Sequence, residues 1–182
     1  MINYSHESLE NKVILITGGS RGFGWFIAEK LLSFGAKVAI TASSGSKELE
    51  ESKSKADKIA GANKCIPIIA DVRNWEDCEL TINQVIDKFG KIDVLVSTAA
   101  ITGNLSPVSH ITENDWNSVF AINLLSNFNL LKYFDKLFRY SEKAHLIFTT
   151  CSQSSLPKPF WGAYGASKAA LEQLVKIYAK EM

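Results

Sequence analysis

A tyrosine and a lysine four residues apart could form an acid–base pair. Tyr164 and Lys168 stand near the start of a helix-forming segment, so they project from one face of that helix. An ordinary tyrosine has a pKa of about 10 and exchanges a proton poorly near neutral pH. A neighbouring ammonium could lower that pKa by roughly three units, which requires about 4 kcal/mol of preferential phenolate stabilisation. The pair therefore predicts a general acid/base; two surface side chains that are merely helix neighbours are the alternative.

A glycine-rich turn is the second candidate for chemistry. Residues 17–24 read Thr-Gly-Gly-Ser-Arg-Gly-Phe-Gly and separate an apolar run from a segment with helical periodicity. Gly18 allows a tight turn, Gly22 lets a phosphate approach the backbone, and Gly24 lets the helix pack close on the strand. Unpaired backbone N–H groups and the positive helix dipole favour a pyrophosphate here. Because the spacing differs from the usual Gly-x-Gly-x-x-Gly fingerprint, a purely structural turn is the alternative.

Strand-like and helix-like segments alternate five times along the chain. We expect strands at about residues 12–17, 37–41, 66–70, 92–96 and 145–150, and helices at about 22–34, 47–59, 75–89, 112–138 and 164–180. The strands are apolar throughout, which is typical of a sheet covered by helices on both faces. The pattern predicts one α/β domain over residues 1–182: a Rossmann-type doubly wound parallel sheet flanked by helices, after a polar lead-in at 1–11.

Composition argues against several kinds of partner. A net charge of +1 over 182 residues gives no reason to expect nucleic acid or an anionic membrane. No apolar stretch approaches the ~18 residues that span a bilayer, and the first residues do not resemble a secretory signal. The three histidines lack metal-ligand spacing, so we expect no metal. The few, widely spaced cysteines indicate reduced thiols, and we predict a cytoplasmic protein.

With the glycine turn and the Tyr–Lys pair in one chain, the sequence resembles the short-chain dehydrogenase/reductase family from about Lys12 onwards. The resemblance implies that Tyr164 is the general acid/base and that Lys168 lowers its pKa and holds the nicotinamide ribose. It also implies that Asn123 supports a proton-relay water and that Asp71 contacts adenine. A hydrogen-bonded helix kink and a strand-end turn are the alternative roles of these two residues. The expected cofactor-binding residues are Gly18, Ser20, Arg21, Gly22, Phe23, Gly24, Ser43, Asp71, Val72, Ala99, Tyr164 and Lys168.

The residues after the second expected strand bear on the choice of cofactor. An NAD site commonly places an acid there to bind the ribose 2′-hydroxyl. By the resemblance that position is Ala42, followed by Ser43, so no acid would repel a 2′-phosphate. Arg21 could pair with that phosphate through two hydrogen bonds. We therefore predict NADP(H), with NAD less favoured; a solvated Arg21 is the alternative.

Two positions depart from the family pattern. The family's substrate-binding serine, about thirteen residues before the tyrosine, is Cys151 here, with Ser152 next. A thiol is a weak hydrogen-bond donor, so we favour Ser152 slightly, provided that its loop turns the hydroxyl inward. Cys151 is alternatively an ordinary buried thiol. The family's Asn-Asn-Ala-Gly after the fourth strand reads Ser-Thr-Ala-Ala over residues 97–100, which lacks the two amide side chains.

The chain ends at Met182, and the resemblance implies that the family's last strands and substrate-binding segment are missing. We therefore expect an exposed sheet edge and exposed apolar surface, which self-association could cover. By the resemblance, the long helix before the fifth strand pairs with its copy in a homo-oligomer.

These observations predict an NADP(H)-dependent oxidoreductase that interconverts a small-molecule carbonyl and an alcohol by hydride transfer. Tyr164 supplies the proton, and Ser152 or Cys151 polarises the oxygen. The alternative is a catalytically silent dinucleotide-binding or interaction protein, which the missing C-terminal segment and the shifted serine favour.

Overall fold

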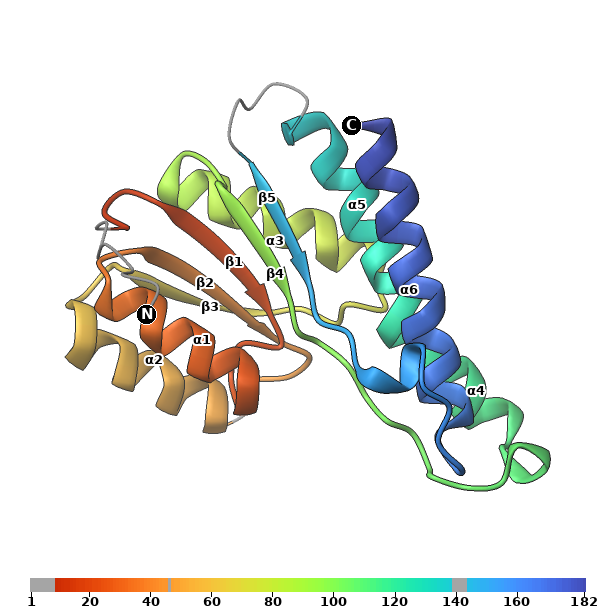
Figure 1. Ribbon diagram of the computed structural model, residues 1–182. Coiled ribbons are helices and arrows are strands. Elements are labelled where there is room, and N and C mark those ends of the chain that lie inside the picture. The colour runs from red at the N-terminus through yellow and green to blue at the C-terminus, as the bar shows by residue number, and fades with distance from the viewer. Residues whose placement is uncertain (1–8, 46, 139–143) are drawn as a thin grey trace, which may run out of the picture.

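A parallel five-stranded sheet forms the centre of the molecule (Figure 1). The computed structural model describes residues 9–45, 47–138 and 144–182. The strands are β1 (Val13–Thr17), β2 (Lys37–Ala42), β3 (Cys65–Ile69), β4 (Val94–Ser97) and β5 (His145–Phe148). Their order is β3-β2-β1-β4-β5, and every neighbouring pair is parallel. The direction of winding reverses between β1 and β4, as in a doubly wound sheet, so the predicted fold class is confirmed.

Helices cover both faces of the sheet. They are α1 (Gly22–Ser33), α2 (Lys47–Ala60), α3 (Trp75–Phe89), α4 (Glu113–Phe120), α5 (Ser126–Phe138) and α6 (Gly162–Glu181). Buried residues of α1 and α2 pack in one core with β1 and β2, and those of α3 and α5 pack in a second core. The loops that leave the strands toward the viewer's lower right in Figure 1 carry the chain to α4 and α6.

Local sequence signals account for several helix ends. Asn74 accepts a hydrogen bond from the backbone N–H of Glu76 (2.9 Å) and so caps the start of α3. Gly90 ends the same helix with a left-handed backbone (φ 82°), which glycine adopts without strain. Thr112 caps α4 by accepting from the Asp115 N–H (3.1 Å). The first eight residues of the expected lead-in lie outside the described residues.

Two expectations about the elements need correction. The helix expected over 112–138 is interrupted by a π-helical turn, η2 (Ala121–Leu125), between α4 and α5. The strands are not all covered on both faces: β3 and β5 expose alternate residues, among them the apolar Ile69 and Ile147. These two are the outermost strands of the described sheet, so the helices that cover its centre leave part of each uncovered.

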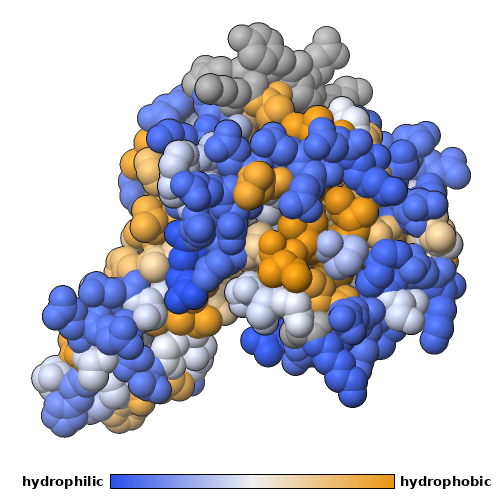
Figure 2. All heavy atoms as spheres, turned by 180° about the vertical axis from the view of Figure 1, so that it is seen from behind, coloured by the Kyte–Doolittle hydropathy of each residue, from blue (hydrophilic) through white to orange (hydrophobic). Residues whose placement is uncertain are grey.

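The expected apolar surface is present beside β5. Ile14, Ile27, Leu31, Val96 and Ile147 line an apolar groove of about 400 Å³ between α1 and the β1–β4–β5 part of the sheet. Ile147 is 51% exposed. Apolar residues also gather in the middle of the face in Figure 2, among polar ones. In the described part of the chain no helix combines the length and apolar character needed to cross a membrane.

Candidate functional site

A groove of about 450 Å³ runs along the carboxyl ends of the central strands. Nine of the predicted cofactor-binding residues line it: Gly18, Ser20, Arg21, Phe23, Gly24, Ser43, Asp71, Val72 and Ala99. Gly22, Asn123, Tyr164 and Lys168 are not among its lining residues. The groove therefore unites the glycine turn with the ends of β2, β3 and β4, while the Tyr–Lys pair lies apart from its walls.

The glycine turn is packed so closely that Gly18, Gly19 and Gly24 have no space for a side chain. Gly18 has φ 66°, and a Cβ there would lie 2.9 Å from Cα of Ala99. A Cβ on Gly24 would collide with the carbonyl oxygen of Gly18 and lie 2.5 Å from Oγ1 of Thr98. Gly22 has φ 55° and open space around it. The first turn of α1 has no acidic residue and no side-chain cap, so its positive end faces the groove uncompensated.

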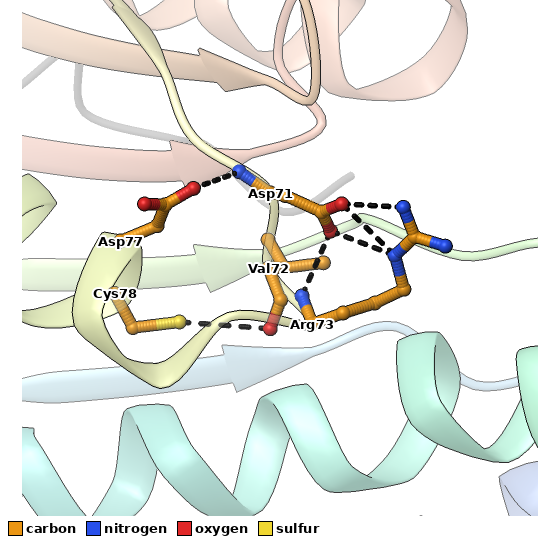
Figure 3. A network of polar contacts seen from close by, with 5 residues as sticks. All are labelled: Asp71, Val72, Arg73, Asp77 and Cys78. Atoms are coloured by element: carbon orange, nitrogen blue, oxygen red, sulfur yellow. Dashed lines mark hydrogen bonds and ion pairs between the residues drawn. The ribbon is translucent and has the colours of Figure 1, made fainter.

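A network of polar contacts fixes the turn after β3, at one wall of the groove (Figure 3). The Asp71 N–H donates to Oδ2 of Asp77 (2.8 Å), and the Asp71 carboxylate accepts from the backbone N–H and Nε of Arg73 (both 3.0 Å). The Cys78 thiol donates to the Val72 carbonyl (3.6 Å). The hydrogen bond from Arg73 holds the pKa of Asp71 below its usual range. Asp71 is thus an ionised, paired group at the groove.

Two charged residues that line the groove were missed by the sequence reasoning. Arg73 follows Asp71 by two residues and pairs with it, as described above. Glu48 stands in the first turn of α2 and lines the groove together with Ser43. Glu48 could have been found from the sequence, because it lies at the start of the helix that follows the second strand, a few residues after Ala42 and Ser43. Glu48 therefore adds a second acidic residue to the groove besides the expected Asp71.

Asn123 is fully buried in the π-helical turn and uses every polar group of its amide. Its Oδ1 accepts from the Ile101 N–H (2.9 Å), and its Nδ2 donates to the Ile101 carbonyl (2.9 Å) and to Oγ of Ser167 (3.0 Å). Ile101 lines the groove and Ser167 belongs to α6, so Asn123 joins the two. The hydrogen-bonded kink is therefore present; the water-relay role stays a prediction.

Tyr164 and Lys168 lie on one face of the first turns of α6, with Nζ of Lys168 5.9 Å from the centre of the tyrosine ring. Lys168 is 2% exposed and donates to the carbonyl oxygen of Thr149 (2.8 Å). Burial lowers the pKa of Lys168. Burial and the neighbouring Cys151 raise the pKa of Tyr164. The lowering of this pKa by Lys168 stays a prediction; in this structure the ammonium donates to Thr149, and burial of the phenol acts in the opposite direction.

Of the two candidate donors, Cys151 is half-buried. Together with burial, it raises the pKa of Tyr164. Ser152 is exposed and its Oγ accepts from Nε2 of Gln153 (2.9 Å). Ser152 begins the short 3₁₀ turn η3 (Ser152–Ser154). The role of Ser152 or Cys151 as the polarising donor stays a prediction.

The hydroxyl residues that replace two asparagines after β4 have a structural use. Oγ1 of Thr98 donates to the carbonyl oxygen of Thr17 (2.6 Å), and Oγ of Ser97 donates to Oδ1 of Asn127 (2.5 Å). These bonds join β4 to β1 and to α5, so the turn is held without the amide side chains. Among the described residues, no three His, Cys, Asp or Glu side chains form a group that could hold a metal ion.

Known proteins resemble this chain in both sequence and structure. The model of the short chain dehydrogenase family matches residues 12–182. A protein of Euphorbia lathyris named short chain aldehyde dehydrogenase 1 is 30% identical over 177 residues, which are 97% of this chain and 60% of that protein. A short chain dehydrogenase of Shigella flexneri, solved in complex with NADP, superposes with a TM-score of 0.89 at 26% identity, covering 97% of this chain and 74% of that one. NAD⁺-bound xylitol dehydrogenase gives a TM-score of 0.90 at 25% identity, covering 96% and 66%.

Proposed function

Because this chain belongs to the short-chain dehydrogenase family, we propose that it is an NADP(H)-dependent oxidoreductase that interconverts a carbonyl and an alcohol. The observation that carries the proposal is the placement of the Lys168 ammonium 5.9 Å from the centre of the Tyr164 ring, with the start of α6 tied through Ser167 and Asn123 to Ile101 in the wall of the glycine-lined groove. The chain spans 60% of the length of the Euphorbia lathyris protein, so the substrate and the activity of the whole protein are part of the proposal.

The groove fits a dinucleotide on two counts. Gly18 and Gly24 leave no room for a side chain, and the uncompensated N-terminus of α1 favours a pyrophosphate. Ser20, Arg21 and Ser43 would hold the phosphate and ribose groups, with Asp71 and Val72 at the adenine. When bound, the nicotinamide cofactor supplies the hydride.

The remaining chemistry belongs to side chains of this chain. Tyr164 would donate the proton to the carbonyl oxygen. Burial and Cys151 raise its pKa, which opposes that role, and the Lys168 ammonium, 5.9 Å from the centre of the ring, is the charge that would offset the rise. The bond of Lys168 to the Thr149 carbonyl fixes its position. Cys151 or Ser152 would be the donor that polarises the carbonyl oxygen.

The proposal is tested by binding and turnover with NADPH. We expect NADPH at one hundred times its Kd to stabilise the protein by about 2.7 kcal/mol, seen as a higher Tm. NADPH should then be oxidised in the presence of some members of a panel of small aldehydes and ketones, followed by its absorbance. Stabilisation without oxidation across the panel would favour the catalytically silent alternative, and the absence of any stabilisation would contradict both.

The preference for NADPH is proposed to depend on Arg21. Its guanidinium lines the groove beside the glycine turn and can make two charge-assisted hydrogen bonds to a 2′-phosphate. The negative charge of Glu48, which also lines the groove, would act against a 2′-phosphate. The solved structures that resemble this chain include one bound to NADP and one bound to NAD⁺, so the preference has to be measured. We expect Arg21→Ala to weaken NADPH binding about 10- to 100-fold, because hydrogen bonds to a charged group are lost. The same change should weaken NADH binding only slightly.

Fluorescence titration with each cofactor measures this difference. Lys30→Ala, an exposed change toward the other end of α1, is the matched control and should alter neither affinity. Equal losses for the two cofactors in Arg21→Ala would contradict the role in phosphate recognition.

The single-domain organisation, the cytoplasmic location and the homo-oligomer stay predictions. Exposed apolar side chains on the long helices support self-association through them: Trp116, Leu125, Phe128 and Ile177. A small-molecule substrate, rather than a nucleic acid or a membrane, fits the family and the near-zero net charge.

A further inference from the structure

Helix α6 holds the loop after β5 at three points. Nζ of Lys168 donates to the carbonyl oxygen of Thr149, as described above. The carboxylate of Glu172 accepts hydrogen bonds from the hydroxyls of Thr150 and Ser154, both at the same oxygen, Oε1. Gly165 lets the backbone come close, since a Cβ there would lie 2.9 Å from the carbonyl oxygen of Gln153.

The three points form a row along the helix. Gly165, Lys168 and Glu172 follow one another at spacings of three and four residues, so they share one face of α6. Cys151 stands between the two hydroxyl residues that Glu172 holds, and the Ser154 hydroxyl also contacts the Cys151 carbonyl oxygen (2.7 Å). The backbone is therefore held before Cys151 through Thr150, and after it through Ser154, whose single hydroxyl hydrogen is shared between the Glu172 carboxylate and the Cys151 carbonyl oxygen.

Glu172 is placed to act as an ionised acceptor. The hydrogen bonds from Ser154 and then Thr150 lower its pKa, and Nζ of Lys176 lies 3.8 Å from its second oxygen, Oε2. Its side chain is 27% exposed, so it is not a core residue whose loss would leave a cavity. A change at this position should free the loop without unfolding the sheet.

We infer that Glu172 is a positioning residue: by accepting from Thr150 and Ser154 it holds the loop that carries Cys151 against the first turns of α6, where Tyr164 stands. The kinetic consequence rests on the proposed function, but the geometry of the loop does not. The inference can therefore be tested with a readout that needs no turnover.

Alkylation of the cysteines provides that readout. Cys65 and Cys78 are 1% and 3% exposed, and burial raises their pKa to about 12 and about 11, so both should react slowly. In Glu172→Ala we expect iodoacetamide to modify Cys151 about tenfold faster than in the wild type, because the loop loses its hydrogen bonds to a charged acceptor and opens more often. Cys65 and Cys78 should keep their wild-type rates, measured for each site by mass spectrometry.

A conservative variant separates hydrogen bonding from loss of the side chain. Glu172→Gln keeps an oxygen that accepts from Thr150 and Ser154, so its Cys151 should react within about threefold of the wild-type rate. Glu181→Gln, an exposed change at the end of the same helix, is the matched control and should have no effect.

Steady-state kinetics give the second readout. Glu172→Ala should lower kcat for carbonyl reduction about tenfold, because Cys151 and Tyr164 lose their alignment, while the Kd for NADPH stays unchanged. Glu172→Gln should restore kcat. Wild-type alkylation of Cys151 in Glu172→Ala, or equal acceleration at all three cysteines, would overturn the inference. A wild-type protein that shows no turnover would contradict the proposed function alone.

Discussion

Replacing Tyr164 with phenylalanine is expected to lower carbonyl reduction by about 10²–10⁴-fold, the usual contribution of a general acid. The change removes the hydroxyl that donates the proton but keeps the ring. That ring packs edge-on against Trp161, with centres 5.7 Å apart, so the start of α6 should keep its structure. NADPH binding should change little, since Tyr164 is not among the residues that line the groove. NADPH oxidation and a fluorescence titration measure the two effects separately.

Tyr178→Phe is the matched control for this experiment. Tyr178 lies near the far end of α6, where its hydroxyl donates to Asp135 (3.2 Å). Losing that hydrogen bond should cost about 1 kcal/mol of stability and leave turnover as it was. Turnover of Tyr164→Phe at the wild-type rate would show that the proton comes from another group, and the proposed mechanism would then be wrong.

Most of the fold follows from signals that are local in the sequence. The strand β1 was expected at residues 12–17 and occupies Val13–Thr17, because a short apolar run ends at a glycine turn. The helix α3 has the expected bounds, because Asn74 and Gly90 determine its two ends within a few residues of the chain. The groove follows from the same logic, since the ends of parallel strands meet at one edge of the sheet.

The features that were missed depend on contacts between distant residues. The π-helical turn at 121–125 is tied to Asn123, whose partners Ile101 and Ser167 lie 22 and 44 residues away. The direction of the Lys168 ammonium depends on the Thr149 carbonyl, which belongs to the end of another element. No periodicity or spacing reports such bonds, so the sequence could identify these site residues but not how their side chains point.

The choice between Cys151 and Ser152 shows the same limit at shorter range. The two residues are neighbours, and their chemistry alone favoured the hydroxyl as the better donor. In the folded chain Ser152 is exposed at the start of a 3₁₀ turn, whereas Cys151 is half-buried, and Glu172 holds Thr150 and Ser154 on either side of them. The burial of two adjacent side chains thus depends on a backbone turn that their chemistry does not report.

The second large effect is expected from alanine at Gly24, where packing and helix propensity act in opposite directions. Gly24 lies inside α1, and in an open helix alanine would be preferred over glycine by about 1 kcal/mol. Here its Cβ would meet the Gly18 carbonyl oxygen and Oγ1 of Thr98, which itself is bound to the Thr17 carbonyl. The helix must therefore move away from the turn, and overpacking of this kind costs about 1–3 kcal/mol.

The gain in helix propensity leaves a net cost of up to about 2 kcal/mol. We therefore expect Gly24→Ala to unfold up to about 8 °C below the wild type, since each 1 kcal/mol lowers Tm by about 2–4 °C in a domain of this size. The rise in Tm on adding NADPH should be largely lost, because the phosphate cradle is widened. Gly61→Ala is the control: Gly61 has φ 81° and open space, so alanine there should lower Tm through backbone strain alone and keep the NADPH response. A Gly24→Ala protein with wild-type Tm and an intact response would mean that the close approach of α1 to the turn is not what shapes the cofactor groove.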